Sequence, residues 1–266
     1  MECSNLAARP SFERYTPAAE VMTGCSWDGS AYCALFGDEQ FSIAPLERFE
    51  RDLDEVKQQT PNARRVWFAG GSPFGMSFEQ LQERAMAVWD RLIKCQSIAM
   101  FASIPDIAGK SDEELRRLRA LHVNGLAVTM GSACDETLEL TGEGYRGADV
   151  LMQCRRLDEV GIEYSLLYTA GLAGRGRGRY NARMTAEVLN QLNPKVLEVQ
   201  RADVGESEPA RQVECLDELR VLIEELQLRV HLEASSLTDA VPLMGILPYD
   251  KPLLLAALEQ ELAANS

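Results

Sequence analysis

The chain has 266 residues, enough for one large domain or two small ones. Its composition, 46% apolar and 26% charged, is that of a globular protein and argues against disorder or a fibrous repeat. The 27 basic and 41 acidic side chains give a net charge of −14. Proteins that grip nucleic-acid phosphates usually carry a basic surface, so this charge argues against bulk nucleic-acid binding.

The N-terminal segment and the cysteines indicate the compartment. The first residues, MECSNLAARPSFERY, carry charges and a proline where a secretory signal needs an apolar core, so we expect a cytoplasmic protein. No run approaches the roughly 20 apolar residues that span a bilayer, so we expect no membrane association. The seven cysteines are odd in number and mostly scattered, which favours free thiols over a disulfide framework.

Short apolar runs alternate with helical patterns through most of the chain. Six strand–helix units in succession imply parallel strands joined by right-handed crossovers. A closed barrel of this kind needs eight units, so the sequence predicts an α/β protein with an open, partial (βα)6 TIM-like barrel. The expected strands are 19–23, 65–69, 97–102, 126–130, 163–169 and 195–200. The expected helices are 45–58, one that opens at Ser77, 111–121, 147–160, 180–192 and 212–228.

The C-terminal residues depart from this alternation. Residues 234–248 look like an irregular cover over the mouth of the barrel, and a last helix is expected at 250–263. We therefore predict a single domain, residues 1–266, with its core at about 15–233 and the cover with its helix at about 234–263.

Glycine-rich loops follow four of the predicted strands. Parallel α/β proteins bind ligands at the C-terminal ends of their strands, so function is expected in these loops. Glycine allows a ligand to approach the backbone closely, but plain turns use glycine for the same reason, so each loop alone is weak evidence. The loops are 24–33 (GCSWDGSAYC), 69–73 (AGGSP), 131–136 (GSACDE) and 170–174 (AGLAG).

The order of these loops resembles the radical S-adenosylmethionine (SAM) superfamily, in its branch of oxygen-independent coproporphyrinogen-oxidase-like and tRNA-modifying-enzyme-like proteins. The resemblance covers roughly residues 15–262. Members of that branch place a C-x4-C-x2-C loop after the first strand. Cys25 and Cys33 match its first and third cysteines, and Tyr32 matches the aromatic residue before the last. The resemblance implies a partial (βα)6 barrel, a [4Fe–4S] cluster, SAM and radical chemistry on a substrate, small or macromolecular, that no residue identifies.

The resemblance also implies positions that bind SAM. The pair Gly70-Gly71 fits the turn that holds the SAM amino group, and residues 171–174 fit the loop near the adenine. Ser72 stands where an acidic residue is common, and the Glu-Ser-Gly that helps to hold the ribose and methionine ends reads GSA at 131–133. The implied cofactor-binding residues are Tyr32, Gly70, Gly71, Ser72, Ser132, Gly171 and Gly174.

Ser30 occupies the middle cysteine position, so the implied metal ligands are Cys25, Cys33 and Ser30. Three thiolates hold three irons of such a cluster, and a serine hydroxyl is a poor substitute because its proton has a far higher pKa. A third thiolate from Cys3 or Cys134, or a ligand from a partner protein, would complete the site. Alternatively, Cys134 simply packs in the interior, as free cysteines usually do.

Arg175, Arg177 and Arg179 form a concentrated basic run in this acidic chain. The run would either clamp a phosphate, carboxylate or RNA backbone at the barrel mouth or form a solvated loop, and the sequence leaves both interpretations open.

Two functions follow from these residues. The first is a radical SAM enzyme, which the retained Cys25, Tyr32 and Cys33 favour. The second is a degenerate barrel without catalysis that binds a ligand or serves a protein partner as a regulatory or scaffold subunit. The departures at Ser30, Ser72 and Gly131 favour this second function.

Overall fold

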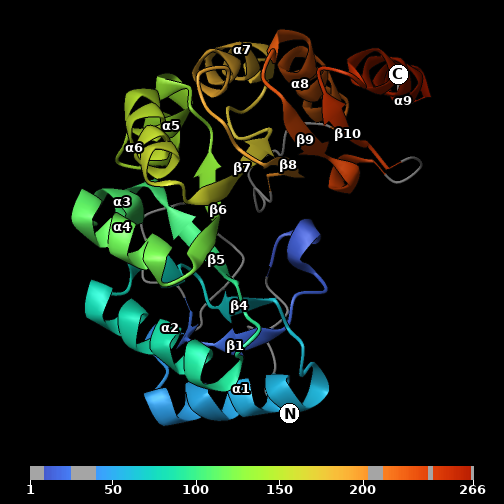
Figure 1. Ribbon diagram of the computed structural model, residues 1–266. Helices are drawn as coiled ribbons and strands as arrows, with labels where there is room; N and C mark the ends of the chain where they lie inside the picture. Colours follow the sequence, from blue (N-terminus) through green and yellow to red (C-terminus); the bar gives the residue numbers. More distant parts are fainter. Residues whose placement is uncertain (1–8, 25–39, 203–211, 239–241, 265–266) are drawn as a thin grey trace. The chain divides into compact units, whose positions relative to one another are not determined.

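The structure is a computed structural model that describes residues 9–24, 40–202, 212–238 and 242–264 (Figure 1). Its strands form one mostly parallel eight-stranded sheet in the order β1-β4-β5-β6-β7-β8-β9-β10, beside a separate β2–β3 pair. The expected α/β class with successive parallel strands is confirmed. The described residues divide into two compact units, one with residues 9–24, 40–128 and 156–164 and one with the remainder.

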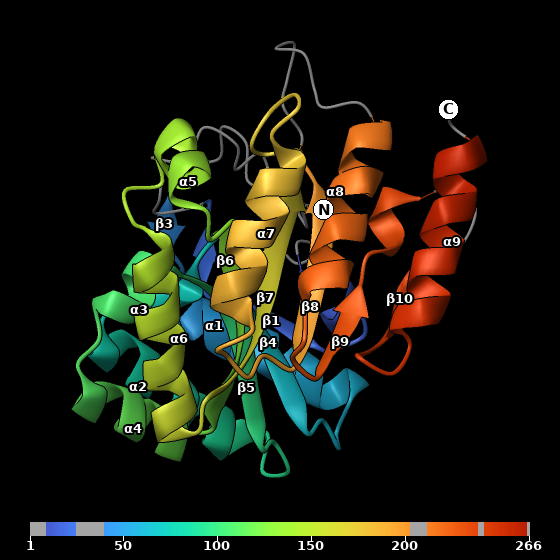
Figure 2. The same ribbon diagram turned by 90° about the horizontal axis from the view of Figure 1, so that it is seen from above.

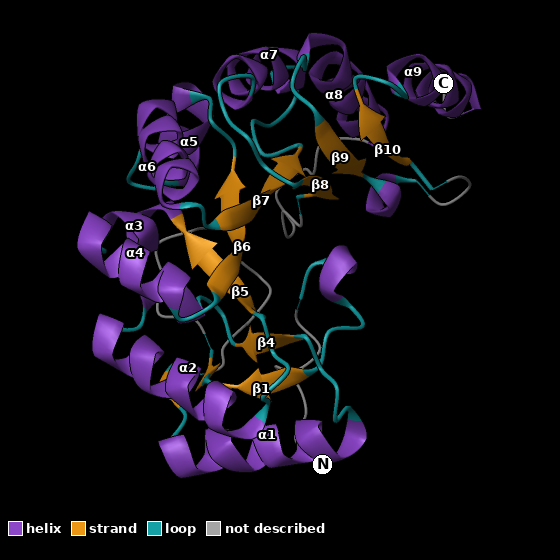
Figure 3. Cartoon of the chain, viewed as in Figure 1, coloured by secondary structure: helices purple, strands orange, loops and turns teal. Residues whose placement is uncertain are grey.

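The first unit packs its strands against α1 and α2, as Figure 3 shows. Phe68 on β4 contacts Phe49 on α1 edge to face, with ring centroids 5.1 Å apart. Trp67, the preceding residue, contacts Phe101 of β5 in the same manner at 5.0 Å, because neighbouring strand residues point to opposite faces. The bounds are β1 Ala18–Glu20, β2 Met22–Thr23, β3 Ser42–Ile43, α1 Leu46–Gln59, β4 Arg65–Ala69, α2 Phe78–Arg91, β5 Ser97–Ser103, α3 Ile104–Ala108 and α4 Asp112–Ala120, with β6 Val123–Gly131 included through residue 128.

The second unit packs α7, α8 and α9 side by side along its strands (Figure 2). Leu197 and Val199 of β8 are fully buried, and Leu166 and Tyr168 lie beside them in register on β7. Tyr168 reaches Glu218 on α8, so these alternate residues form the face of the strands that the helices cover. The bounds are α5 Asp135–Thr141, α6 Gly147–Val160, β7 Glu163–Ala170, α7 Gly178–Leu189, β8 Val196–Arg201, α8 Gln212–Glu225, β9 Val230–Glu233, β10 Met244–Leu247 and α9 Lys251–Ala264, where α6 from residue 156 and β7 through residue 164 belong to the first unit.

The first predicted strand divides in two. Residues 18–20 pair with β4, whereas β2 pairs antiparallel with β3 in the separate sheet. Val21 lies at the division: its N–H donates to the Ala69 carbonyl, and its own carbonyl accepts from Ala44 N, both at 3.0 Å. The apolar pattern of residues 18–23 does not reveal that the strand changes its pairing partner, because the residues before and after Val21 are all buried or half-buried.

The prediction of an irregular cover at 234–248 was wrong in part. Residues 244–247 form β10, which pairs antiparallel with β9, a short strand that the sequence analysis also missed. Along β9, His231 is exposed between buried Val230 and Leu232, and along β10 Met244 and Ile246 are the exposed positions. At the far side of β10, the Ile246 N–H donates to Asp250 Oδ2 at 2.7 Å.

Candidate functional site

The cysteine loop is not among the residues that the structure describes. Cys25, Ser30, Tyr32 and Cys33 lie outside the described ranges, as does Cys3. The cluster motif therefore remains a prediction from the sequence.

The predicted glycine turn, Gly70-Gly71, lies at the end of β4 and contacts the end of β2. Gly70 adopts a φ of +149°, and a Cβ atom there would lie 2.1 Å from Met22 Cγ, so glycine is required. The Gly71 N–H donates to the Gly24 carbonyl at 3.0 Å. Because Gly24 directly precedes Cys25 in the sequence, this hydrogen bond holds the residue from which the cysteine loop starts.

Ser72, the residue after the glycine turn, forms a hydrogen bond with the carboxylate of Asp106. Its side chain is buried, and its hydroxyl donates to Asp106 Oδ2 on α3. The same oxygen accepts the Ser103 N–H at 2.9 Å, so a capping box holds the carboxylate in place. Asp106, on the helix that follows β5, thus holds a carboxylate next to position 72, where the sequence has no acidic residue.

A buried lysine supports the 3-10 turn at Pro73–Gly75. Lys110 Nζ donates to the Phe74 carbonyl at 3.0 Å and lies 5.4 Å from the centroid of the Phe74 ring. Burial lowers the pKa of Lys110, and Asp106 and Glu114 partly oppose this effect. The lysine therefore contributes to the shape of the segment that follows the glycine turn.

In the second unit, Ser132 lies in the loop after β6 and is fully buried. Its hydroxyl donates to Asn181 Oδ1 at 2.6 Å and accepts the Cys134 N–H at 2.9 Å. Thr185 accepts the neighbouring Ala133 N–H at 3.1 Å. The Ser132 side chain is thus bound within the protein, and its predicted contact with a cofactor remains a prediction.

The loop after β7 contains the other two predicted glycines. Gly171 and Gly174 have φ values of +87° and +77°, and Gly174 N donates to the Gly171 carbonyl at 3.0 Å. The Gly171 N–H donates to Glu218 Oε2 on α8 at 2.8 Å. The structure therefore forms a tight glycine loop at the predicted place and holds it with a buried carboxylate.

Cys134 is packed in the interior, one of the two interpretations that the sequence left open. It is 1% exposed, its Sγ donates to Glu136 Oε2 at 3.2 Å, and burial raises the pKa of its thiol. The other described cysteines, Cys95, Cys154 and Cys215, are also buried. Within the described ranges, no group of three or more His, Cys, Asp or Glu side chains is arranged to hold a metal ion.

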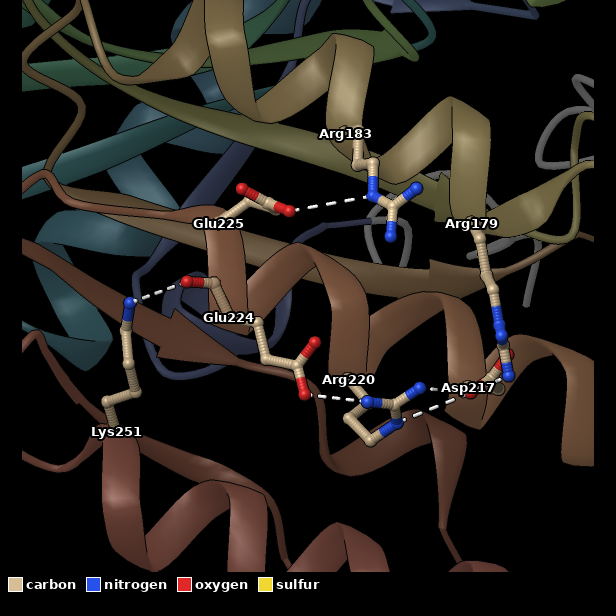
Figure 4. A network of polar contacts seen from close by, with 7 residues as sticks. All are labelled: Arg179, Arg183, Asp217, Arg220, Glu224, Glu225 and Lys251. Carbon is tan, nitrogen blue, oxygen red and sulfur yellow. Dashed lines mark hydrogen bonds and ion pairs between the residues drawn. The ribbon is translucent and has the colours of Figure 1, made fainter.

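Arg175, Arg177 and Arg179 of the basic run are all exposed. Arg179 pairs with Asp217 on α8, with Arg179 Nη2 3.1 Å from Asp217 Oδ1. Arg220, which is also on α8, donates to the same carboxylate (Figure 4). Arg179 therefore joins α7 to α8.

The sequence analysis missed Glu218, Asn181, Thr185 and Tyr168. A signal for Glu218 was present, because it lies three residues after Cys215 and four before Leu222, on the apolar face of α8. A carboxylate at such a position is unusual, so helical periodicity alone would have marked it.

No protein-family model matches the chain. The haem chaperone HemW of Bacillus subtilis (strain 168) is 31% identical over 138 residues, which make up 49% of this chain and 36% of that protein. The match thus spans about a third of the length of HemW.

Two solved structures share the fold. Coproporphyrinogen III oxidase (HemN) from Escherichia coli, described as a radical SAM enzyme, aligns with a TM-score of 0.56 and 13% identity over 79% of this chain and 52% of its own. The radical SAM methyltransferase TsrM from Kitasatospora setae, with cobalamin and a [4Fe-4S] cluster bound, aligns with a TM-score of 0.55 and 16% identity over 74% of this chain and 41% of its own.

No helix in the described ranges is both long and apolar enough to cross a membrane. The fold and the strand-end loops agree with the resemblance seen in the sequence. The chain is thus similar in sequence to part of HemW and shares the fold of these two radical SAM enzymes.

Proposed function

We propose that this chain binds SAM, or a ligand with the same ammonium and nucleoside groups, at its strand ends without assembling a [4Fe–4S] cluster from its own thiols. The observation that carries the proposal is the hydrogen bond from Ser72 to Asp106, which puts a carboxylate beside the glycine turn. A carboxylate is the partner that an ammonium group needs.

The available donors do not fit a three-thiolate cluster. Cys25 and Cys33 supply two thiols and Ser30 a hydroxyl. Cys134 does not supply the third, because burial and its hydrogen bond to Glu136 keep it protonated and inside. When bound, such a cluster would supply an electron to SAM. No radical step is assigned to this chain.

The proposed binding is tested by titrating SAM into the purified chain in a calorimeter. In Asp106→Asn the amide still accepts from Ser103 N but carries no charge, so we expect an affinity about tenfold weaker. The control is Glu113→Gln, a neutralised carboxylate that is 72% exposed on α4 and should leave the affinity unchanged. Absence of SAM binding by the unaltered chain would overturn the proposal. Haemin is titrated in parallel because HemW is named as a haem chaperone.

The second candidate is a radical SAM enzyme whose third ligand comes from Cys3 or a partner. The retained Cys25, Tyr32 and Cys33 favour it. Anaerobic reconstitution followed by iron counting and electron paramagnetic resonance separates the two functions. We expect no stable cluster in the unaltered chain and about four irons in Ser30→Cys. About four irons in the unaltered chain, with a signal that SAM perturbs, would establish the enzyme instead.

A further inference from the structure

Glu218 is buried on α8, with 1% of its surface exposed. A buried carboxylate costs several kcal/mol unless hydrogen bonds compensate it. Its two oxygens accept three hydrogen bonds from neutral groups: Oε1 from Tyr168 OH and from Asn181 Nδ2 at 2.8 Å, and Oε2 from Gly171 N at 2.8 Å. An apolar residue would fill the same space without this cost, so the role of the carboxylate lies in what it holds.

The space around Glu218 is shaped to admit the carboxylate. A Cβ atom at Gly178, near the start of α7, would lie 2.6 Å from Glu218 Oε2, so only glycine fits at that position without a shift. The donors themselves come from β7, from the loop after β7 and from α7. One carboxylate thus joins three segments that surround the end of β7.

The hydrogen bonds continue from Glu218 to the loop after β6. Asn181 donates to Glu218 and accepts from Ser132, which in turn accepts from the backbone of Cys134. Ser132, Asn181 and Glu218 are each at most 1% exposed, so water does not replace these bonds. The Cys134 N–H donates to Ser132, Ser132 donates to Asn181, and Asn181 donates to Glu218. The Gly171 N–H donates to Glu218 directly, so both sets of hydrogen bonds end at this carboxylate.

We infer that Glu218 is a positioning residue that sets the conformation of both strand-end loops, 131–134 and 171–174, and couples one to the other through Asn181. The effect on affinity rests on the proposed function, because that proposal places the ligand at strand ends and these loops follow two of the strands. Because of this coupling, a change in the conformation of one loop alters the conformation of the other. The affinity for the ligand then depends on Glu218, which does not contact the ligand.

Glu218→Gln would break this arrangement, because the amide keeps one acceptor oxygen and places an NH2 donor where the other oxygen accepts. In Glu218→Gln at least one of the hydrogen bonds from Tyr168, Asn181 or Gly171 is lost. We expect faster backbone hydrogen exchange in both loops and an affinity for SAM about tenfold weaker.

The test is hydrogen–deuterium exchange with mass spectrometry on the ligand-free full chain, beside SAM titration. Ser132→Ala removes the hydroxyl at the far end of the series and leaves Glu218 intact, so it tests the coupling even if Glu218→Gln does not fold. We expect faster exchange at 171–174 in Ser132→Ala, an effect that a purely local role would not produce. Glu225→Gln, a half-exposed carboxylate on the same helix, is the control and should leave both loops unchanged.

An increase in exchange confined to 131–134 in Ser132→Ala would overturn the coupling, and unchanged exchange in Glu218→Gln would overturn the positioning role. The exchange measurement needs no ligand. If SAM fails to bind the unaltered chain while the exchange results are as expected, the proposed function fails and the positioning of the loops stands.

Discussion

Asn181 on α7 and Glu218 on α8 are joined by a hydrogen bond of 2.8 Å, and both side chains are withdrawn from solvent. Burial raises the pKa of the Glu218 carboxyl above its ordinary value of 4.5, although Tyr168, Asn181 and Gly171 each donate to it and oppose the shift. The protein therefore retains a carboxylate in its interior that hydrogen bonds compensate only in part.

This arrangement predicts how stability changes with pH. Because the folded chain holds the Glu218 proton more tightly than the unfolded chain, the contribution of this group is complete below pH 4.5 and is lost as the pH rises through the raised pKa. We expect the free energy of unfolding of the unaltered chain, minus that of Glu218→Gln, to fall as pH rises from 4.5. Urea unfolding of both chains over that range measures it, and a difference independent of pH would contradict the assignment.

Gly70→Ala should destabilise the first unit. The new methyl group would lie 2.1 Å from Met22 Cγ and 3.0 Å from the Met22 carbonyl, in a backbone conformation that L residues rarely adopt. We expect a loss of about 2–4 kcal/mol in the free energy of unfolding. Gly109→Ala is the matched control, since its φ is −69° and the nearest atom would lie 3.4 Å away. Equal losses in the two variants would rule out the close approach of Met22 as the cause.

The four described cysteines should be unreactive in the folded chain. Burial raises the pKa of the Cys134 and Cys95 thiols, and it raises the pKa of Cys215 to about 11. In a variant with Cys3, Cys25 and Cys33 replaced by alanine, a disulfide reagent should modify no thiol rapidly until denaturant is added. Rapid modification of Cys134, located by mass spectrometry, would contradict this prediction and make Cys134 a candidate for the third thiolate of the cluster again.

Arg179→Ala tests whether the basic run binds the ligand. Arg179 is held by Asp217, which Arg220 also contacts, and exposed pairs of this kind contribute little to stability. We expect the urea midpoint and the SAM affinity to be unchanged. A clear loss of affinity with an unchanged midpoint would favour the clamp interpretation of Arg175–Arg179.

Much of the fold could be predicted because local patterns determine it. The strand at 65–69 has the predicted bounds, and Ser77 with Gln80 forms the capping box that the sequence indicates. The short strands β9 and β10 could not be predicted in the same way. Each has four residues, and their stability comes from pairing with each other and, for β9, with β8.

The candidate site was predictable in its backbone and less so in its side chains. The glycines at 70 and 171 were identified from their place after predicted strands and from the family resemblance, and the structure gives both a positive φ. The bond between Ser72 and Asp106, 34 residues apart, joins the ends of two neighbouring strands and has no local pattern. The path from Ser132 through Asn181 to Glu218 likewise depends on tertiary contacts between segments far apart in the chain.

The hydrogen bond between Ile246 and Asp250 has a consequence for association between molecules. β10 is the last strand of the sheet, and Met244 and Ile246 on it are half-exposed, a combination that invites a strand from another chain to add to the edge. Asp250 occupies the Ile246 N–H and places a negative charge where such a strand would bind. A charge at a sheet edge disfavours pairing with a second chain, so we expect Asp250→Ala to self-associate more readily than the unaltered chain.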